Sequence, residues 1–281
     1  MNYPGKQNPM RDFTISTYKT LLNTLIDQGY AFQPFSDFLR SPSGKVIILR
    51  HDVDARKENS LRFAEIQHEL SIRGSYYFRV VPGSYDEEVI RKIAGMGHEV
   101  GYHYETMDTE SSRLQIQNSK FQVPNSEIKD KGNELVDGAF EEFCRNLDMF
   151  RKIVPVTTIC MHGSPRSRFD NKDIWNKYDY RSLGIIGEPY FDIDFDKVGY
   201  LTDTGRRWNG DKVSVRDKVE SNFDFNFRST HDIIRSVDEL PERVMFTFHP
   251  QRWNDNVYEW SKELLMQNVK NQVKYWLMKV G

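Results

Sequence analysis

The stretch Lys45–Asp54 (KVIILRHDVD) places an imidazole and two carboxylates directly after an apolar run. Asp52 and Asp54 are two residues apart, so their side chains point the same way in an extended chain. Two neighbouring carboxylates repel each other unless a cation or a shared proton compensates their charge. The pattern therefore indicates a site for metal binding or acid–base chemistry at the end of a buried strand.

Three more histidines follow apolar runs in the same way: His103, His162 and His249. The carboxyl ends of parallel strands meet at one edge of a sheet, so we expect these imidazoles near Asp52 and Asp54. A divalent metal held by a carboxylate and imidazoles acidifies water and polarises a carbonyl group. A second carboxylate can act as base and a further histidine as acid. These parts predict a metal-assisted hydrolytic site.

The elements that must position these residues alternate between strands and helices. Apolar runs bounded by turn residues predict strands, and apolar residues at helical spacing predict helices between them. This order favours a parallel sheet or barrel with its helices outside. Two segments are expected to be loops, 108–132 and 201–210. The expected strands are 46–49, 75–81, 99–103, 156–161 and 244–248, and the expected helices are 14–28, 58–70, 86–96, 135–153, 230–236 and 258–280.

The order HDVD, GHEVGYH, HGSP and FTFHP resembles the polysaccharide deacetylase superfamily, also known as the NodB-homology or carbohydrate esterase family 4 fold. The resemblance is greatest to the branch with an RHDVD opening and runs from about Lys45 to Arg252. It implies an α/β fold, a distorted (β/α) barrel of about seven parallel strands. We expect one domain over residues 1–281, with an N-terminal helical extension over about 1–44.

The resemblance also implies roles for individual residues. Asp52 matches the catalytic base and Asp54 the metal-binding aspartate, although Val53 separates two residues that are normally adjacent. His103 matches a metal-binding histidine, and His249 matches the proton donor. The implied cofactor is a divalent metal ion, zinc first, with cobalt, nickel or manganese as alternatives.

One position departs from the family pattern. The second metal-binding histidine should fall at Met107, and a thioether is a poor ligand for the metals expected here. Either His162 or Glu105 would then complete the shell, and we place His162 among the predicted ligands.

The predicted substrate contacts come from two later motifs. In HGSPRSR, Arg166 or Arg168 would orient the base, and we count Arg166 as substrate-binding. Trp208 could stack on a sugar ring, with plain packing equally compatible with its position. For His51, a hydrogen bond to the backbone at the barrel mouth is favoured over metal binding.

The bulk composition narrows the function further. The 281 residues include 38% hydrophobic and 13% aromatic residues, which suffice for a full core. A net charge of −2 favours neither a nucleic-acid partner nor an anionic membrane. Cys144 and Cys160 are expected to be reduced and buried rather than a chelating pair. No apolar leader or membrane-length apolar stretch is found, so we expect a cytoplasmic protein.

The main hypothesis is therefore a hydrolase of carbon–nitrogen bonds that removes an N-acyl group, with acetyl as the first candidate, from an amino sugar. The substrate would be a carbohydrate or intracellular glycan precursor, as in surface-polysaccharide biosynthesis. Two alternatives stay open. One is a catalytically inactive barrel that only binds a glycan or a partner, which the missing histidine at Met107 favours. The other is an amidase that acts on a non-sugar amide.

Overall fold

The structure is a computed structural model that describes residues 11–121, 131–163, 169–208 and 219–280. These residues form a seven-stranded sheet in which every paired strand is parallel. The strands are β1 (Ala31–Gln33), β2 (Val46–Val53), β3 (Ser75–Phe78), β4 (Glu99–Tyr104), β5 (Ile159–Met161), β6 (Gly199–Thr202) and β7 (Arg243–Phe248).

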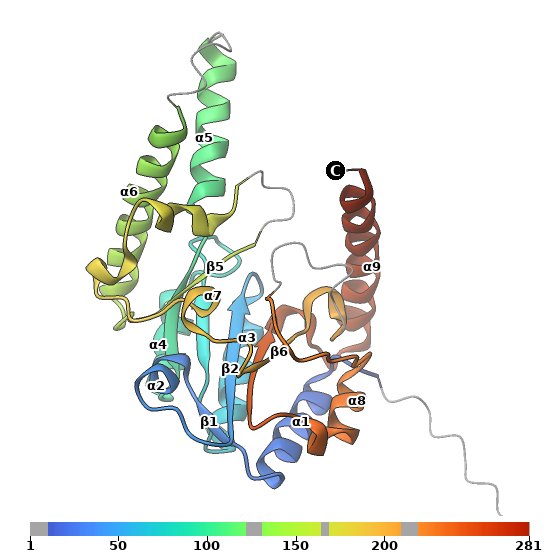
Figure 1. The fold of residues 1–281 in the computed structure, drawn as a ribbon. Helices are drawn as coiled ribbons and strands as arrows, with labels where there is room; N and C mark the ends of the chain where they lie inside the picture. The colour runs from blue at the N-terminus through green and yellow to red at the C-terminus, as the bar shows by residue number, and fades with distance from the viewer. Residues whose placement is uncertain (1–10, 122–130, 164–168, 209–218, 281) are drawn as a thin grey trace, which may run out of the picture.

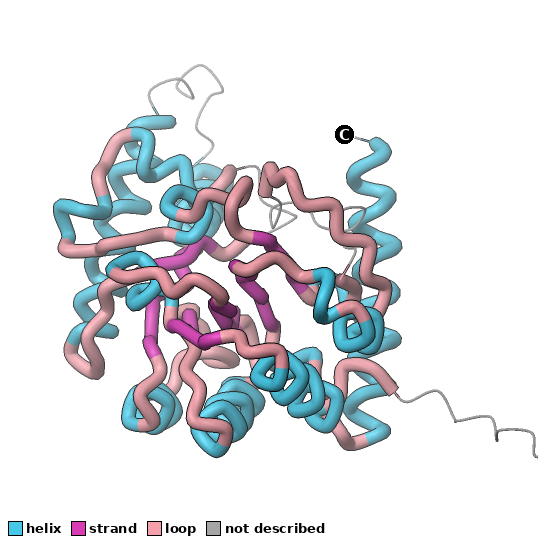
Figure 2. The backbone as a smooth tube through the Cα atoms, turned by 60° about the horizontal axis from the view of Figure 1, so that its bottom comes forward, coloured by secondary structure: helices cyan, strands magenta, loops and turns pink. Residues whose placement is uncertain are grey.

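Strand β2 is the centre of the sheet. The order is β5-β4-β3-β2-β7-β6, and β1 also pairs with β2. Strand β1 pairs with the first half of β2, at Val46–Ile48, and β3 pairs with the second half, at Arg50–Val53. The curled sheet forms a half-barrel surrounded by helices (Figure 2). The predicted α/β architecture, a distorted (β/α) barrel of about seven parallel strands, is confirmed.

The alternation of side chains along β2 determines which residues face the interior. All eight residues of β2 are buried, as expected for a central strand covered on both faces. Ile47, Leu49 and Val53 belong to the apolar cluster shared with the surrounding helices. Val46 and Ile48 belong to a second cluster on the opposite face of the sheet. Because the side-chain period is two, Asp52 lies on the same face as Val46 and Ile48.

The helices cover the sheet, but α5 and α6 extend well beyond it (Figure 1). Two loop predictions are wrong in part. Helix α5 occupies much of the predicted loop at 108–132, and strand β6 includes the first two residues of the predicted loop at 201–210. The helices are α1 (Ile15–Asp27), α2 (Phe35–Arg40), α3 (Lys57–Glu69), α4 (Glu87–Gly95), α5 (Thr106–Phe121), α6 (Lys131–Arg151), α7 (Pro189–Asp192), α8 (Thr230–Arg235) and α9 (Val257–Val280).

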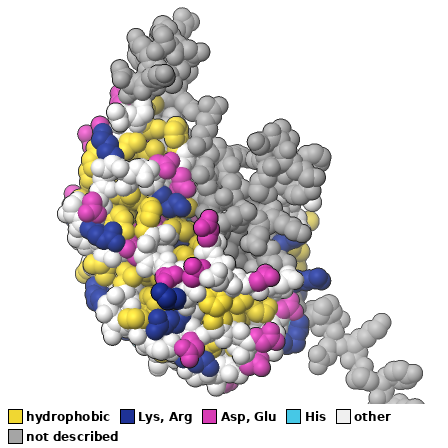
Figure 3. Space-filling view, viewed as in Figure 1, with side chains coloured by type: hydrophobic (Ala, Val, Ile, Leu, Met, Phe, Trp, Pro, Cys, Tyr) yellow, Lys and Arg dark blue, Asp and Glu magenta, His cyan; other side chains and the backbone are white. Residues whose placement is uncertain are grey.

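The outer surface mixes charges of both signs. On the face shown in Figure 3, acidic and basic side chains are interspersed over the described part, with hydrophobic side chains between them. Within the described residues, no helix is both long enough and apolar enough to cross a membrane.

Candidate metal centre

The predicted site residues come together where four strands end. Asp52 lies near the end of β2, and Asp54 follows that strand directly. His103 lies in β4, while His162 and His249 follow β5 and β7. Since all four strands run in parallel, their carboxyl ends lie at one edge of the sheet, where ligands of such folds bind.

The orientation of His103 is fixed by the neighbouring strand. Its Nδ1 lies 2.9 Å from the backbone carbonyl of Cys160, which can only accept a hydrogen bond. Nδ1 therefore carries a proton, and Nε2 is the nitrogen that is left to face the site. That Nε2 atom is 3.5 Å from Asp54 Oδ1 and 3.8 Å from Asp52 Oδ2. Two carboxylates that lie this close to one nitrogen repel each other unless a cation or a proton on Nε2 compensates their charge.

Asp54 is the point on which the imidazoles converge. Its Oδ1 atom is 3.6 Å from His162 Nε2, in addition to its approach to His103. This oxygen is buried and, within the described part of the chain, accepts no hydrogen bond. Its Oδ2 atom accepts a hydrogen bond from Gln251 Nε2 at 3.2 Å and lies 3.8 Å from His249 Nε2. Burial opposes ionisation of Asp54, but the three imidazoles around it hold its pKa well below the usual value.

A carboxylate lies behind His162. Glu105 Oε2 is 3.1 Å from His162 Nδ1, on the side of the ring that faces away from Asp54. Arg79 donates two hydrogen bonds to Glu105, at 3.0 and 2.6 Å, and a third to the Asp54 carbonyl. Burial would raise the pKa of Glu105, but His162 and Arg79 lower it to about 2. Glu105 thus stays ionised and contacts His162 rather than Asp54.

Asp52 has a different environment from Asp54. Both of its oxygens accept hydrogen bonds from Arg50, at 2.9 and 2.6 Å, in a pair that is almost completely buried. The Arg50 guanidinium also donates to the Tyr190 hydroxyl. This bidentate pair fixes the plane of the Asp52 carboxylate.

His249 is held from behind by a buried aspartate. Asp203 Oδ1 lies 2.6 Å from His249 Nδ1, and Asp203 is fully buried. The same carboxylate accepts hydrogen bonds from the His249 backbone, from Arg252 and from the Trp253 indole. Burial would raise the pKa of Asp203, but the charges of His249 and Arg252 lower it. Nε2 of His249 is left facing Asp54.

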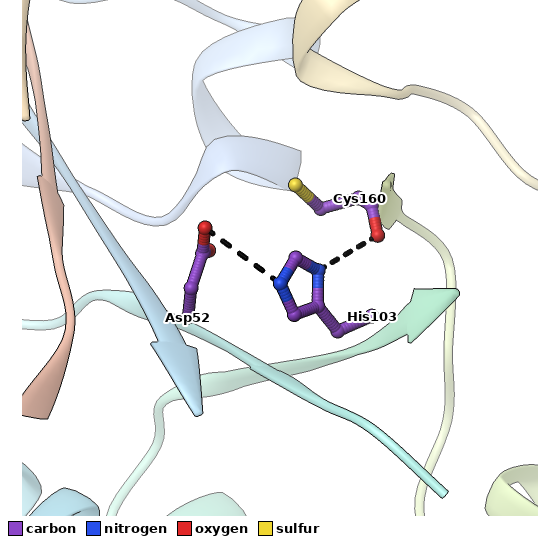
Figure 4. Close-up of side chains that lie close together, drawn as sticks. All are labelled: Asp52, His103 and Cys160. Atoms are coloured by element: carbon purple, nitrogen blue, oxygen red, sulfur yellow. Dashed lines mark hydrogen bonds and ion pairs between the residues drawn. The ribbon is translucent and has the colours of Figure 1, made fainter. Parts of the chain in front are cut away.

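A second grouping shares His103 with the first. Asp52, His103 and Cys160 are all buried and each offers a ligand atom within 4.8 Å of the others, so this group could hold a metal ion (Figure 4). Cys160 packs in the apolar cluster on the inner face of the sheet, together with Tyr77.

The other predicted residues that the structure describes lie away from this convergence. His51 points to the opposite face of β2, where Nδ1 bonds to the Ser75 carbonyl, as favoured from the sequence. Met107 is buried in the core. Trp208 is also buried, and its indole N–H donates to Thr230, so its substrate-binding role stays a prediction that this packing does not support. Arg166 and Arg168 lie outside the described residues.

Three contributors were not recognised from the sequence: Arg50, Arg79 and Asp203. Arg50 has the clearest signal, because it lies two residues before Asp52 on one strand and so shares its face. Asp203 follows β6, whose Thr202 pairs with Thr247 of β7, so the strand-end rule would have found it had β6 been recognised.

Comparisons of this chain with family models, with curated proteins and with solved structures found no match. The fold and the site together define an α/β half-barrel with a buried group that could hold a metal ion at the carboxyl edge of its sheet.

Proposed function

We propose that this chain is a metal-dependent hydrolase that removes an N-acyl group from an amino sugar. The observation that carries the proposal is the buried Oδ1 of Asp54, which accepts no hydrogen bond from the described residues and lies 3.5 and 3.6 Å from two imidazole nitrogens. Two ligands of one tetrahedral zinc ion, each bonded at roughly 2.0–2.2 Å, lie about 3.4 Å apart. Asp54 is therefore spaced from His103, and from His162, as two ligands of one divalent metal are.

This set of ligands is favoured over the group that contains Asp52 and Cys160. Both oxygens of Asp52 are already paired with Arg50, whereas Asp54 Oδ1 has no hydrogen-bond donor among the residues that the structure describes. Two imidazoles and one carboxylate are also a common set for catalytic zinc, which leaves one position open. Glu105 would then orient His162 through Nδ1, as carboxylates commonly do behind metal-binding histidines.

The chain's own residues supply the proton transfers of amide hydrolysis. A bound divalent metal would polarise the amide carbonyl and make water more acidic. Asp52, oriented by Arg50, would take a proton from the water that adds to the carbonyl carbon. His249, oriented by Asp203, would give a proton to the nitrogen as the carbon–nitrogen bond breaks. The products are a carboxylic acid and a free amine.

The sugar part of the proposal is supported by the motif resemblance, and the hydrolytic part by the site. The substrate would be an acetylated precursor of a surface polysaccharide that is present in the cytoplasm, and the metal would be zinc. A binding barrel without catalysis is the second candidate, because Met107 is a core residue where the resemblance expects a metal-binding histidine.

The test compares wild type with Asp54→Asn, which keeps the shape but weakens the ligand, and with Asp238→Asn at an exposed position as control. After chelation and reloading, we expect wild type and Asp238→Asn to hold one metal per chain and to release acetate from N-acetylated sugars. Asp54→Asn should bind zinc at least ~10-fold more weakly and lose activity in parallel.

Equal zinc affinity in Asp54→Asn would exclude Asp54 as a ligand. Metal binding without acetate release from any amide would favour the binding barrel. Acetate release from non-sugar amides alone, with N-acetylated sugars inert, would instead identify an amidase.

A further inference from the structure

One oxygen of Asp54 is held by a residue that the proposed reaction does not use. The Gln251 side chain donates a hydrogen bond from Nε2 to Asp54 Oδ2 at 3.2 Å. An ionised carboxylate can only accept, so the amide turns its nitrogen toward Asp54 and its oxygen away. That amide oxygen is buried and has no donor among the described residues. The hydrogen bonding of the Gln251 side chain is thus directed at Asp54.

The backbone on either side of Gln251 is tied to a neighbouring helix. Gln251 is the middle residue of the short 3₁₀ helix η7 (Pro250–Arg252), which follows β7 and packs against α3. Asn59 of α3 donates hydrogen bonds to the carbonyls of Pro250 and Trp253, at 3.1 and 3.2 Å. Because these two carbonyls flank Gln251, its backbone has a fixed place beside the end of β2.

The two oxygens of Asp54 therefore have different surroundings. Oδ2 accepts from Gln251, whereas Oδ1 lies 3.5 Å from His103 Nε2 and 3.6 Å from His162 Nε2. A carboxylate can bind a metal through one oxygen or through both. Binding through both oxygens would bring a cation closer to the Gln251 N–H group, whose partial positive charge opposes it. Gln251 thus favours binding through Oδ1 alone.

We propose that Gln251 is a positioning residue that limits Asp54 to one metal-binding oxygen and so selects zinc over larger ions such as manganese. Zinc in proteins is usually four-coordinate, so it needs only one oxygen from each carboxylate. Manganese is typically six-coordinate and bound through oxygen, so it gains more from the second oxygen. The inference rests on the proposed function, because it takes Asp54 as a metal ligand.

The first test measures the affinity of the metal-free protein for Zn²⁺ and for Mn²⁺ by competition with a chelator. Gln251→Met keeps the length of the side chain but removes the donor. We expect its zinc affinity to fall by about 10-fold, and the ratio of zinc to manganese affinity to fall by at least as much. Gln272→Met makes the same change at an exposed position on α9 and should match wild type.

The second test reports the coordination of the metal through the visible absorption of the cobalt-loaded protein, which is stronger with four ligands than with five or six. We expect strong absorption from wild type and Gln272→Met. Gln251→Met should absorb more weakly, because Asp54 can then bind through both oxygens. Circular dichroism and thermal unfolding of the metal-free variants check that they fold. Gln251→Leu, which also lacks a donor, should behave like Gln251→Met.

Equal loss of affinity for both metals in Gln251→Met, or a cobalt spectrum that matches wild type, would overturn the proposal. Asp54→Asn separates this failure from failure of the site. If Asp54→Asn weakens zinc binding and Gln251→Met changes neither affinity, only the role of Gln251 is wrong. If Asp54→Asn binds zinc as tightly as wild type, the proposed metal site is wrong and the role of Gln251 is wrong with it.

Discussion

The three site imidazoles share one arrangement: the nitrogen of each that faces away from Asp54 has an oxygen partner. For His103 that partner is a backbone carbonyl and for His249 it is the Asp203 carboxylate, while for His162 the Glu105 carboxylate lies 3.1 Å from Nδ1. Each ring is therefore turned so that Nε2 faces Asp54. Partners of this kind fix both the tautomer and the ring plane of metal-binding histidines. The orientation of the site thus depends on residues that do not themselves face Asp54.

Asp203→Asn tests the most heavily used of these partners. The side-chain amide that replaces the carboxylate would point its N–H group at neighbours that are themselves hydrogen-bond donors. It would also leave the buried Arg252 without its counter-charge. We expect a loss of about 3–5 kcal/mol in the free energy of unfolding, measured with urea. Asp238→Asn, at an exposed position, should cost less than about 0.5 kcal/mol. Equal stability of the two variants would show that the buried carboxylate contributes no net stability.

At the scale of single residues, the sequence was informative where a strand end is marked by an apolar run. Asp52, Asp54, His103, His162 and His249 were all expected at one edge, and the structure places them there. What the sequence could not show is which atoms pair. Glu105 and His162 were equivalent candidates beside Asp54, and only the strand geometry places His162 in front and Glu105 behind it.

At the scale of elements, Gly101 explains how β4 brings His103 to the centre of the site. A Cβ atom at Gly101 would lie 2.4 Å from Tyr77 Cε1 and 2.8 Å from the Thr158 carbonyl oxygen. Tyr77 is fully buried and bonds to Thr158, so it has little room to move. Only glycine allows β4 to lie this close to β3 and β5.

Gly101→Ala should therefore destabilise the protein by about 1–3 kcal/mol through overpacking and should weaken metal binding through the displacement of His103. Gly95→Ala is the control, because nothing lies within 4 Å of a Cβ there, at the end of α4. It should be neutral or stabilising. Urea unfolding and zinc titration measure both effects, and similar behaviour of the two variants would contradict the packing argument.

Elements whose apolar residues recur at a clear period along the sequence were predictable, and elements without such a pattern were not. Strand β2 and helix α1 have an apolar run or a regular apolar stripe, and both lie where expected. Helix α5 lacks a marked apolar face because it extends beyond the sheet and packs chiefly on α6. Strand β6 has four residues, too few for a period, and only its pairing with β7 defines it.

At the scale of the whole molecule, two buried histidines make stability depend on pH. Burial lowers the pKa of His51 to about 3 and that of His98 to about 4. In His51, Nε2 accepts a hydrogen bond from Gln67, which protonation would break. Both pKa values lie below the unfolded value of roughly 6.5, so the unfolded chain binds these protons first. The two neutral histidines contribute fully to the free energy of unfolding above about pH 6.5, and this contribution is lost as the pH falls.

We expect the free energy of unfolding to decrease between about pH 6.5 and pH 4, by up to about 1.4 kcal/mol per pH unit for each histidine. Glu188 opposes this loss of stability at low pH. Burial raises its pKa to about 7, so the folded chain binds a proton at Glu188 before the unfolded chain does. Glu188→Gln should therefore steepen the decrease. Urea unfolding at several pH values measures both slopes, and a flat profile in wild type and variant would contradict the assignment.

Strand β2 also limits how the length of this chain can change. Its alternate residues serve two faces, with Arg50 and Asp52 on one and His51 on the other. Deletion or insertion of one residue within 46–52 would exchange the faces, placing a carboxylate among the helices and an apolar side chain in the site. The exposed turn at 41–45 can absorb such a change without altering either face. Among sequences that share this fold, we therefore expect length variation in that turn and none within the strand.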